Sequence, residues 1–291
     1  MVSSKKEWVG YYLFLAPAFI IFVVFIFGPM IYSFILSFFE YNMMTINEAK
    51  FVGFNNFKSL LANKQFLAAC KNTLIYTLTT VPIMLVLGFL IASLINSKYV
   101  RYKLTYKICY YIPYVSSMVA VVQVFSLIFN ASTNGTANQI LTKLGLEPIG
   151  WLSTSKWAMV IVIILGIWKQ LGYVIIIYIG GLLAVPGEVY ESASLDPISP
   201  FTLARKITLP LIRPTTIFLL VTETINGFQV FTPVQILTDG GPGYSTTTLV
   251  TLLYDKGFKE YKMGIASAIS LILFLVLLIL SIIQNKIGDR E

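Results

Sequence analysis

The sequence has no histidine, only two cysteines and few charged residues. Asp, Glu, Lys and Arg make up 12% of it, whereas soluble domains carry about 25%. Without histidine the chain lacks the most common general base, zinc ligand and pH switch near neutrality. Cys70 and Cys109 form no CxxC pair, so neither a metal site nor a redox site is predicted. A GxxxxGK segment is also missing, which excludes a P-loop for nucleotide binding in this chain.

Hydrophobic residues make up 57% of the chain and gather in long blocks. Each block has about 20 mostly apolar residues, enough to cross roughly 30 Å of hydrocarbon as a helix. Helices are required because backbone groups in lipid must be satisfied within the segment. We expect an all-α integral membrane protein with about six transmembrane helices. The predicted spans are 11–38, 72–95, 108–129, 157–184, 214–237 and 264–284.

Two further expectations concern these spans. The first block, from Tyr11, is too long for the apolar region of a signal peptide, so we expect a retained helix. Prolines interrupt several spans, and kinks are expected where neighbouring groups can satisfy the freed carbonyls. These prolines are Pro17, Pro29, Pro82, Pro113 and Pro233.

The distribution of basic residues predicts the orientation. With both termini cytoplasmic, the inner segments hold 11 Lys and Arg in 56 residues, and the outer segments hold 9 in 84. All four arginines then lie inside. The net charge of +8 is explained by the positive-inside rule and gives no reason to expect nucleic-acid binding. The inner segments are 1–9, 96–107, 186–213 and 285–291.

The inner segment before the fifth span is unusually long and is predicted to form two short helices. Glu188 and Glu191 fall in the first turn of the first helix, where negative charge suits the helix dipole. Asp196 precedes Pro197, and a residue before proline tends to leave the helical region, so this helix should end there.

The second short helix has its own start signal. Ser199 is placed as its N-cap and Pro200 as its first residue. Pro210 and Pro214 are expected to separate it from the fifth span. Such a pair of helices suits either docking to another protein or an amphipathic position in the membrane interface, and these observations leave both open.

Several short motifs resemble one family of transport proteins. Residues Glu191, Ser192, Ala193, Asp196 and Ile207–Pro210 are similar to the EAA loop of ATP-binding-cassette (ABC) importer permeases. The other motifs resemble the sugar-permease branch with the larger maltose-permease subunit: Leu15–Pro17, Asn72–Thr73, Ile112–Tyr114 and Thr238–Pro242. The resemblance covers nearly the whole chain. It departs from the family at Pro197, where the family has a glycine, so this corner is expected to differ in shape.

The resemblance implies a type I ABC importer permease, with residues 1–291 as one transmembrane domain and 188–210 as a coupling loop within it. It implies partners: a second, homologous permease chain, two ATPase subunits that hold ATP and Mg, and an extracytoplasmic binding protein, all at the bacterial cell membrane. The chain itself would hold no cofactor or metal and would not be an enzyme. Residues implied to couple to the ATPase are Glu191, Ser192, Ala193, Leu195, Asp196 and Pro197.

Two charged residues lie well inside predicted spans. Lys169 and Glu223 each cost about 2.5–3.5 kcal/mol at mid-helix on insertion scales. Their opposite signs predict that they pair, either as a purely structural ion pair or while facing a central cavity. Glu223, Asn226 and Gly227 follow at i, i+3 and i+4 on one helix face, and Gln229 extends this polar strip.

The resemblance also implies which residues line a sugar pathway. By distance from the family motifs, the sugar-lining positions fall on Tyr114, Met118, Gly166, Lys169, Gln170, Tyr173, Asn226, Gly227 and Val230. Amides and aromatic rings suit sugars, which present hydroxyl groups and flat apolar faces. We therefore predict a subunit of an ATP-driven sugar importer, with an oligosaccharide as the expected cargo. The alternatives are an ion-coupled carrier or channel that uses Lys169 and Glu223 without an ATPase, and a membrane scaffold.

Overall fold

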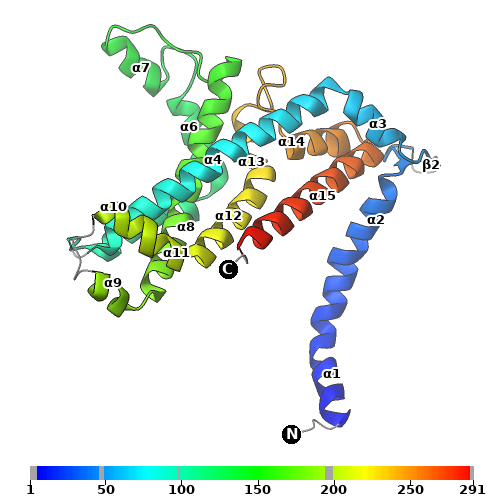
Figure 1. The fold of residues 1–291 in the computed structure, drawn as a ribbon. Coiled ribbons are helices and arrows are strands. Elements are labelled where there is room, and N and C mark those ends of the chain that lie inside the picture. The colour runs from blue at the N-terminus through cyan, green and yellow to red at the C-terminus, as the bar shows by residue number, and fades with distance from the viewer. Residues whose placement is uncertain (1–4, 46–48, 98, 194–198, 289–291) are drawn as a thin grey trace. The chain divides into compact units, whose positions relative to one another are not determined.

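The computed structural model describes residues 5–45, 49–97, 99–193 and 199–288, nearly all of them helical (Figure 1). The chain divides into two compact units. Unit 1 holds the residues up to 63 together with 253–274, and unit 2 holds 64–252 together with the residues from 275 onward. The expectation of a single permease domain stays a prediction.

Unit 1 begins with the first candidate span, Tyr11–Leu36. This span is built from α1 (Lys5–Phe22), the π-helix η1 (Val23–Phe27) and α2 (Gly28–Leu36). Then follow the antiparallel strands β1 (Phe39–Glu40) and β2 (Lys50–Phe51), and α3 (Asn55–Ala62). The unit also contains the π-helix η3 (Asp255–Lys259) and the start of α15 (Met263–Gly288).

The end of α2 is fixed by buried polar contacts within unit 1. Asn56 donates its amide to the carbonyls of Ser37 and Phe39, both at 2.9 Å. Gly264 lies so close to Phe39 that a Cβ atom at this position would be 2.0 Å from the Phe39 carbonyl oxygen. The start of α15 can approach this backbone only because residue 264 has no side chain.

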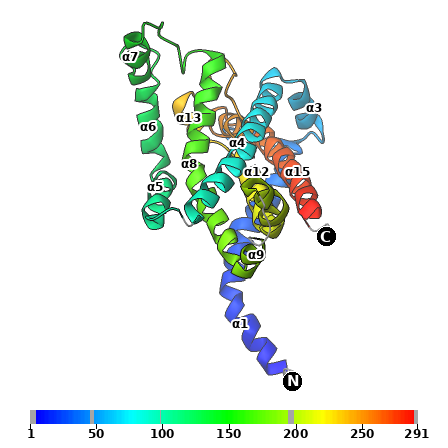
Figure 2. The same ribbon diagram turned by 60° about the vertical axis from the view of Figure 1, so that its left-hand side comes forward.

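Unit 2 is a helical assembly. Its elements are α4 (Lys64–Asn96), α5 (Lys103–Val115), α6 (Met118–Ile128), α7 (Thr136–Lys143), α8 (Ser155–Ala184), α9 (Gly187–Ala193), α10 (Pro200–Leu203), the π-helix η2 (Ala204–Thr208), α11 (Leu209–Leu211), α12 (Arg213–Phe228), α13 (Thr232–Leu237), α14 (Leu249–Tyr254) and the end of α15. Both views place α7 at one end of this unit and α9 at the other (Figure 1, Figure 2).

The core of unit 2 lies where α4, α8 and α12 pack together. Val81, Val174, Tyr178 and Leu219 are among its buried side chains. Gly88 brings α4 close to α8, because a Cβ atom there would lie 2.6 Å from a methyl group of Val174. This three-helix core fixes the positions of the polar side chains described below.

Five helices in the described residues are long and apolar enough to cross a membrane, and one bent helix pair is a sixth candidate. The predicted span 108–129 corresponds to the bent pair, in which α5 and α6 meet at an angle of 92°, and the bend lies after the expected kink at Pro113. Ser116 and Ser117 adopt ψ angles of 151° and 127°, which turn the chain between the two helices. The helix continues through Pro113 and breaks only where two successive residues are extended.

The fifth span is also interrupted. Helix α12 ends at Phe228 and α13 starts at Thr232, with Pro233 in its first turn. Phe231, at the junction, has φ −134° and ψ −69°, outside the helical region. By contrast, α1 and α4 continue through Pro17 and Pro82. Proline alone therefore did not identify the breaks.

Candidate functional site

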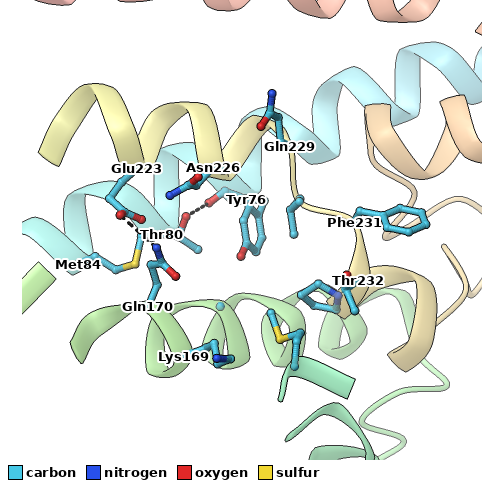
Figure 3. Close-up of a pocket in the computed structure, with 15 residues that line it drawn as sticks. Tyr76, Thr80, Met84, Lys169, Gln170, Glu223, Asn226, Gln229, Phe231 and Thr232 are labelled. Atoms are coloured by element: carbon cyan, nitrogen blue, oxygen red, sulfur yellow. Dashed lines mark hydrogen bonds between the residues drawn. The ribbon is translucent and has the colours of Figure 1, made fainter. Parts of the chain in front are cut away.

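A cavity of about 230 Å³ opens in unit 2 between α4, α8 and α12. The first residue of α6 and the break between α12 and α13 complete its wall (Figure 3). Its lining residues are Tyr76, Thr80, Met84, Met118, Gly166, Lys169, Gln170, Glu223, Asn226, Gly227, Gln229, Val230, Phe231, Thr232 and Pro233. The cavity thus joins segments far apart in the sequence.

Helix α12 supplies a polar strip, as predicted. Glu223, Asn226 and Gly227 line the cavity together, which their i, i+3, i+4 spacing requires. Gln229, just after the last turn of α12, extends the strip. Gly227 also lets α4 come close, because a Cβ atom there would be 2.9 Å from the Thr77 hydroxyl.

Glu223 is buried, with 1% of its surface exposed. One carboxylate oxygen, Oε1, accepts a hydrogen bond of 3.2 Å from the Gln170 amide of α8, and the two side chains point toward each other in Figure 3. The other oxygen, Oε2, is buried and has no hydrogen-bond partner among the described residues. An unpaired buried carboxylate oxygen is costly, so this group is a candidate for a ligand or substrate contact.

Lys169 has different partners from Glu223. Its ammonium donates to the carbonyls of Tyr114, at 2.5 Å, and Ser116, at 2.9 Å. The predicted ion pair with Glu223 is therefore wrong, and none joins the two side chains in the part of the chain that the structure describes. The physical reason is the break after α5, since the last carbonyls of a helix have no intrahelical donor and a lysine can supply one.

Tyr114 and Tyr173 lie beside the cavity without lining it. Their rings stack, with centroids 5.2 Å apart and an interplanar angle of 24°. The Lys169 ammonium lies 5.7 Å from the Tyr114 ring centroid. Of the predicted pathway residues, these two tyrosines are the ones outside the lining, and the others line the cavity. Their roles in transport stay predictions.

Helix α4 contributes three lining residues that the sequence reasoning missed. Tyr76, Thr80 and Met84 follow at i, i+4 and i+8 on one face, and the first two are polar groups in an otherwise apolar span. The spacing of Tyr76 and Thr80 was the sequence signal that could have identified this face of α4 as part of the cavity. A Cβ atom at Gly166 would lie 2.1 Å from the Tyr76 hydroxyl, so Gly166 gives this ring its place against α8.

The break after α12 contributes the remaining missed residues, Phe231, Thr232 and Pro233. Within a membrane, irregular backbone is tolerated where it is buried in protein or lines a cavity. Here the Val230 carbonyl accepts a hydrogen bond of 3.0 Å from the Thr248 hydroxyl. The break thus opens the helix at the cavity while its carbonyl remains satisfied.

The predicted coupling residues that the structure describes, Glu191, Ser192 and Ala193, lie in α9, at the end of unit 2 opposite α7 (Figure 1). Helix α9 carries Glu188 in its first turn, whereas the prediction that Glu191 shares this turn is wrong, because Glu191 is the fifth residue of α9. Glu191 and Ser192 are exposed. Ala193, half-buried, is the last residue of α9. Leu195, Asp196 and Pro197, and with them the expected end of the first helix, lie outside the described residues.

The second short helix begins as predicted. The Ser199 side chain caps α10 by accepting the backbone N–H of Thr202 at 3.2 Å, and Pro200 is the first helical residue. Pro210 and Pro214 separate it from α12 less than expected. Helical structure runs from α10 through η2 and α11, and Ile212 alone interrupts it before α12.

The chemistry of this site favours noncovalent recognition. Amide, hydroxyl and carboxylate groups face the cavity beside the apolar side chains of Met84, Met118 and Val230. No group of three or more Cys, Asp and Glu side chains in the described residues could hold a metal ion. Such a mixed lining can hydrogen-bond hydroxyl groups and cover apolar faces of a small polar molecule.

Most of the chain matches a known protein family. Residues 59–290 match the family described as "Binding-protein-dependent transport system inner membrane component". The arabinooligosaccharides transport system permease protein AraP of Bacillus subtilis is 35% identical over 286 residues, which is 98% of this chain and 90% of AraP. The lactose transport system permease protein LacF of Rhizobium radiobacter is 32% identical, covering 97% of this chain and 95% of LacF.

Solved structures give the same picture. Two crystal structures of a bacterial alginate ABC transporter each contain a chain with a TM-score of 0.85 and 28% identity, covering 98% of this chain and 96% of that one. One is a complex with an alginate pentasaccharide-bound periplasmic protein. The other is described as a transporter that imports the acidic polysaccharide alginate.

Proposed function

The chain belongs to the family of binding-protein-dependent transport system inner membrane components, and on this basis we propose that it is the permease subunit of an ATP-driven oligosaccharide importer. It forms half of the translocation pathway and is a transport subunit, not an enzyme. The observation that carries the proposal is the polar cavity between α4, α8 and α12, bordered by two broken helices. Broken helices that border a binding site recur in membrane transporters.

The lining of the cavity supports a sugar as cargo. Gln170 and Asn226 offer amides, Tyr76 and Thr80 offer hydroxyl groups, and Glu223 offers a carboxylate. Sugar hydroxyl groups both donate and accept hydrogen bonds, so this set can match them without a formal charge on the cargo. The relatives named for arabinooligosaccharides and lactose support the same substrate class.

The coupling segment, residues 188–210, supports transport that is driven by ATP hydrolysis in partner subunits. A nearly continuous helical run extends from Pro200 to Phe228, so a displacement at α10 is transmitted along α12 to Glu223 and Asn226. We infer that two ATPase subunits hold ATP and Mg, and that the coupling loop 188–210, which includes α9, docks on an ATPase subunit. In this arrangement Glu191 pairs with a basic group of the ATPase, and Ser192, Ala193 and Leu195 pack against it.

The remaining partners follow from the family. An extracytoplasmic binding protein delivers the sugar, and a second, homologous permease completes the pathway. The complex of the alginate transporter with a periplasmic protein supports the first of these. We also infer that both termini are cytoplasmic, since the basic residues are denser in the segments on that side. The α9 end of unit 2 then faces the ATPases.

The test is sugar uptake by the assembled transporter in proteoliposomes. Wild-type protein should take up oligosaccharide only with ATP and the binding protein. Glu191→Arg should lower uptake by about tenfold or more, because a like charge replaces an ion pair worth ~1.4 kcal/mol or more at the docked surface. The matched control is Glu147→Arg, which makes the same charge change at an exposed residue after α7.

Uptake by the control should equal that of the wild type. Full uptake without any ATPase, driven by an ion gradient, would instead favour the carrier alternative. Co-purification supplies a second readout, since Glu191→Arg should release the ATPase from the permease and Glu147→Arg should retain it.

A further inference from the structure

Glu223 is the one acidic side chain in the described lining of the cavity. Glu223 Oε1 accepts from Gln170, and Oε2 has no partner among the described residues. The carboxylate comes from α12, at the wall where α12 faces α8 (Figure 3). Its 1% exposure means that bulk water does not surround the carboxyl group.

The basic residue Lys169 also lines the cavity, but its ammonium group is hydrogen-bonded to the end of α5. The Lys169 ammonium lies on the carbonyls of Tyr114 and Ser116 at the C-terminal end of α5. That end of a helix carries a partial negative charge, which offsets part of the ammonium charge. The other lining side chains are uncharged. At the α12 wall of the described lining, the charged side chain that a cargo meets is therefore Glu223.

From this arrangement we infer that the cavity selects uncharged saccharides over uronates, and that Glu223 is the residue that determines this specificity. The inference rests on the proposed function and narrows its substrate class. A carboxylate on the cargo would meet the carboxylate of Glu223 in a poorly screened cavity, where like charges repel without contact. A neutral hydroxyl group meets an acceptor instead.

Proteins similar to this chain are named for both neutral and acidic saccharides. AraP and LacF are named for arabinooligosaccharides and lactose, and the alginate transporter imports an acidic polysaccharide. All three resemble this chain over nearly its full length, so overall fold does not separate the two classes of cargo.

The test compares neutral and acidic sugars of the same size on the purified transporter without its binding protein. Dissociation constants of arabinotriose, galactotriose and trigalacturonate are measured by calorimetry or saturation-transfer NMR. Wild-type protein should bind a neutral trisaccharide about tenfold or more tightly than trigalacturonate. Glu223→Gln should reduce this preference to about threefold or less, and Glu223→Asp, which retains the charge, should preserve it.

The matched control is Glu147→Gln, which removes the same charge from an exposed site and should leave the preference unchanged. Equal or tighter binding of trigalacturonate by the wild type would overturn the inference and leave the proposed function intact. An unchanged preference in Glu223→Gln would also overturn the role of this residue. If no saccharide bound and no ATP-driven uptake occurred, the proposed function itself would fail.

Discussion

Lys169 and Thr248 each donate a hydrogen bond to a carbonyl at a broken span, but one donor is charged and the other neutral. At the break after α5, the Lys169 ammonium contacts two carbonyls, of Tyr114 and Ser116. At the break after α12, the Thr248 hydroxyl contacts one, of Val230. Both breaks border the same cavity.

The difference between the charged donor Lys169 and the neutral donor Thr248 suggests that the first break fixes the shape of the helix pair and the second borders the polar strip. A lysine inside a span costs about 2.5–3.5 kcal/mol on insertion scales, so it is retained where its charge is satisfied. Here it stabilises a 92° bend. At the break after α12, the adjacent polar strip with Glu223 and Asn226 faces the cavity. The proposal thus gives charge two roles in this membrane domain, one in folding for Lys169 and one in selection for Glu223.

The largest effect is expected for the charge swap, in which Lys169→Glu is combined with Glu223→Lys. A carboxylate at 169 would face two carbonyl oxygens, and an ammonium at 223 would face the Gln170 amide as a second donor. Uptake should therefore stay at background, as in each single variant. Recovery of uptake in the double variant would show that the two residues pair, and would contradict the separate roles.

Removal of the charged donor alone should have the next largest effect. Lys169→Met leaves both carbonyls at the end of α5 unsatisfied, and hydrogen bonds to charged groups contribute about 1.5–3 kcal/mol each. We expect a loss of roughly 3 kcal/mol in the free energy of unfolding. Chemical denaturation of the detergent-solubilised transporter measures it. Lys169→Arg keeps the donors and should lose less; equal losses in the two variants would argue against this capping role.

Removal of the neutral donor, the Thr248 hydroxyl, should have the smallest effect on the free energy of unfolding. Thr248→Val removes the single hydrogen bond to the Val230 carbonyl, and bonds between transmembrane helices average about 0.6 kcal/mol. The same denaturation measurement should show a loss of about 1 kcal/mol or less, with Thr248→Ser close to wild type. A loss as large as that of Lys169→Met would remove the distinction between the two breaks.

Local patterns in the sequence predicted what depends on local structure. The cap at Ser199, the proline start of α10 and the shared face of Glu223, Asn226 and Gly227 are all confirmed. Each follows from the geometry of a single helix turn. The family resemblance predicted the fold and seven of the fifteen residues that line the cavity.

The sequence did not predict contacts made across long separations. Lys169 reaches a carbonyl 55 residues away, and no local pattern shows that α5 ends in front of it. The sequence shows the charge of Lys169 but not its position in the fold. Glu223, the other charge well inside a predicted span, was therefore predicted as its partner. The bend at Ser116 and Ser117 was missed for a related reason, since Pro113 nearby was the stronger sequence signal.

Accessibility of the cavity wall tests the transport role most directly. Cys70 and Cys109 are replaced by serine, Thr232→Cys is introduced at the break lining the cavity, and a membrane-impermeant thiol reagent is applied to the assembled transporter. In the resting state labelling should come from the cytoplasmic side and slow when oligosaccharide is present. With ATP and the binding protein, labelling should come from the outer side. A rate that depends on neither sugar nor ATP would contradict a cargo pathway through this cavity.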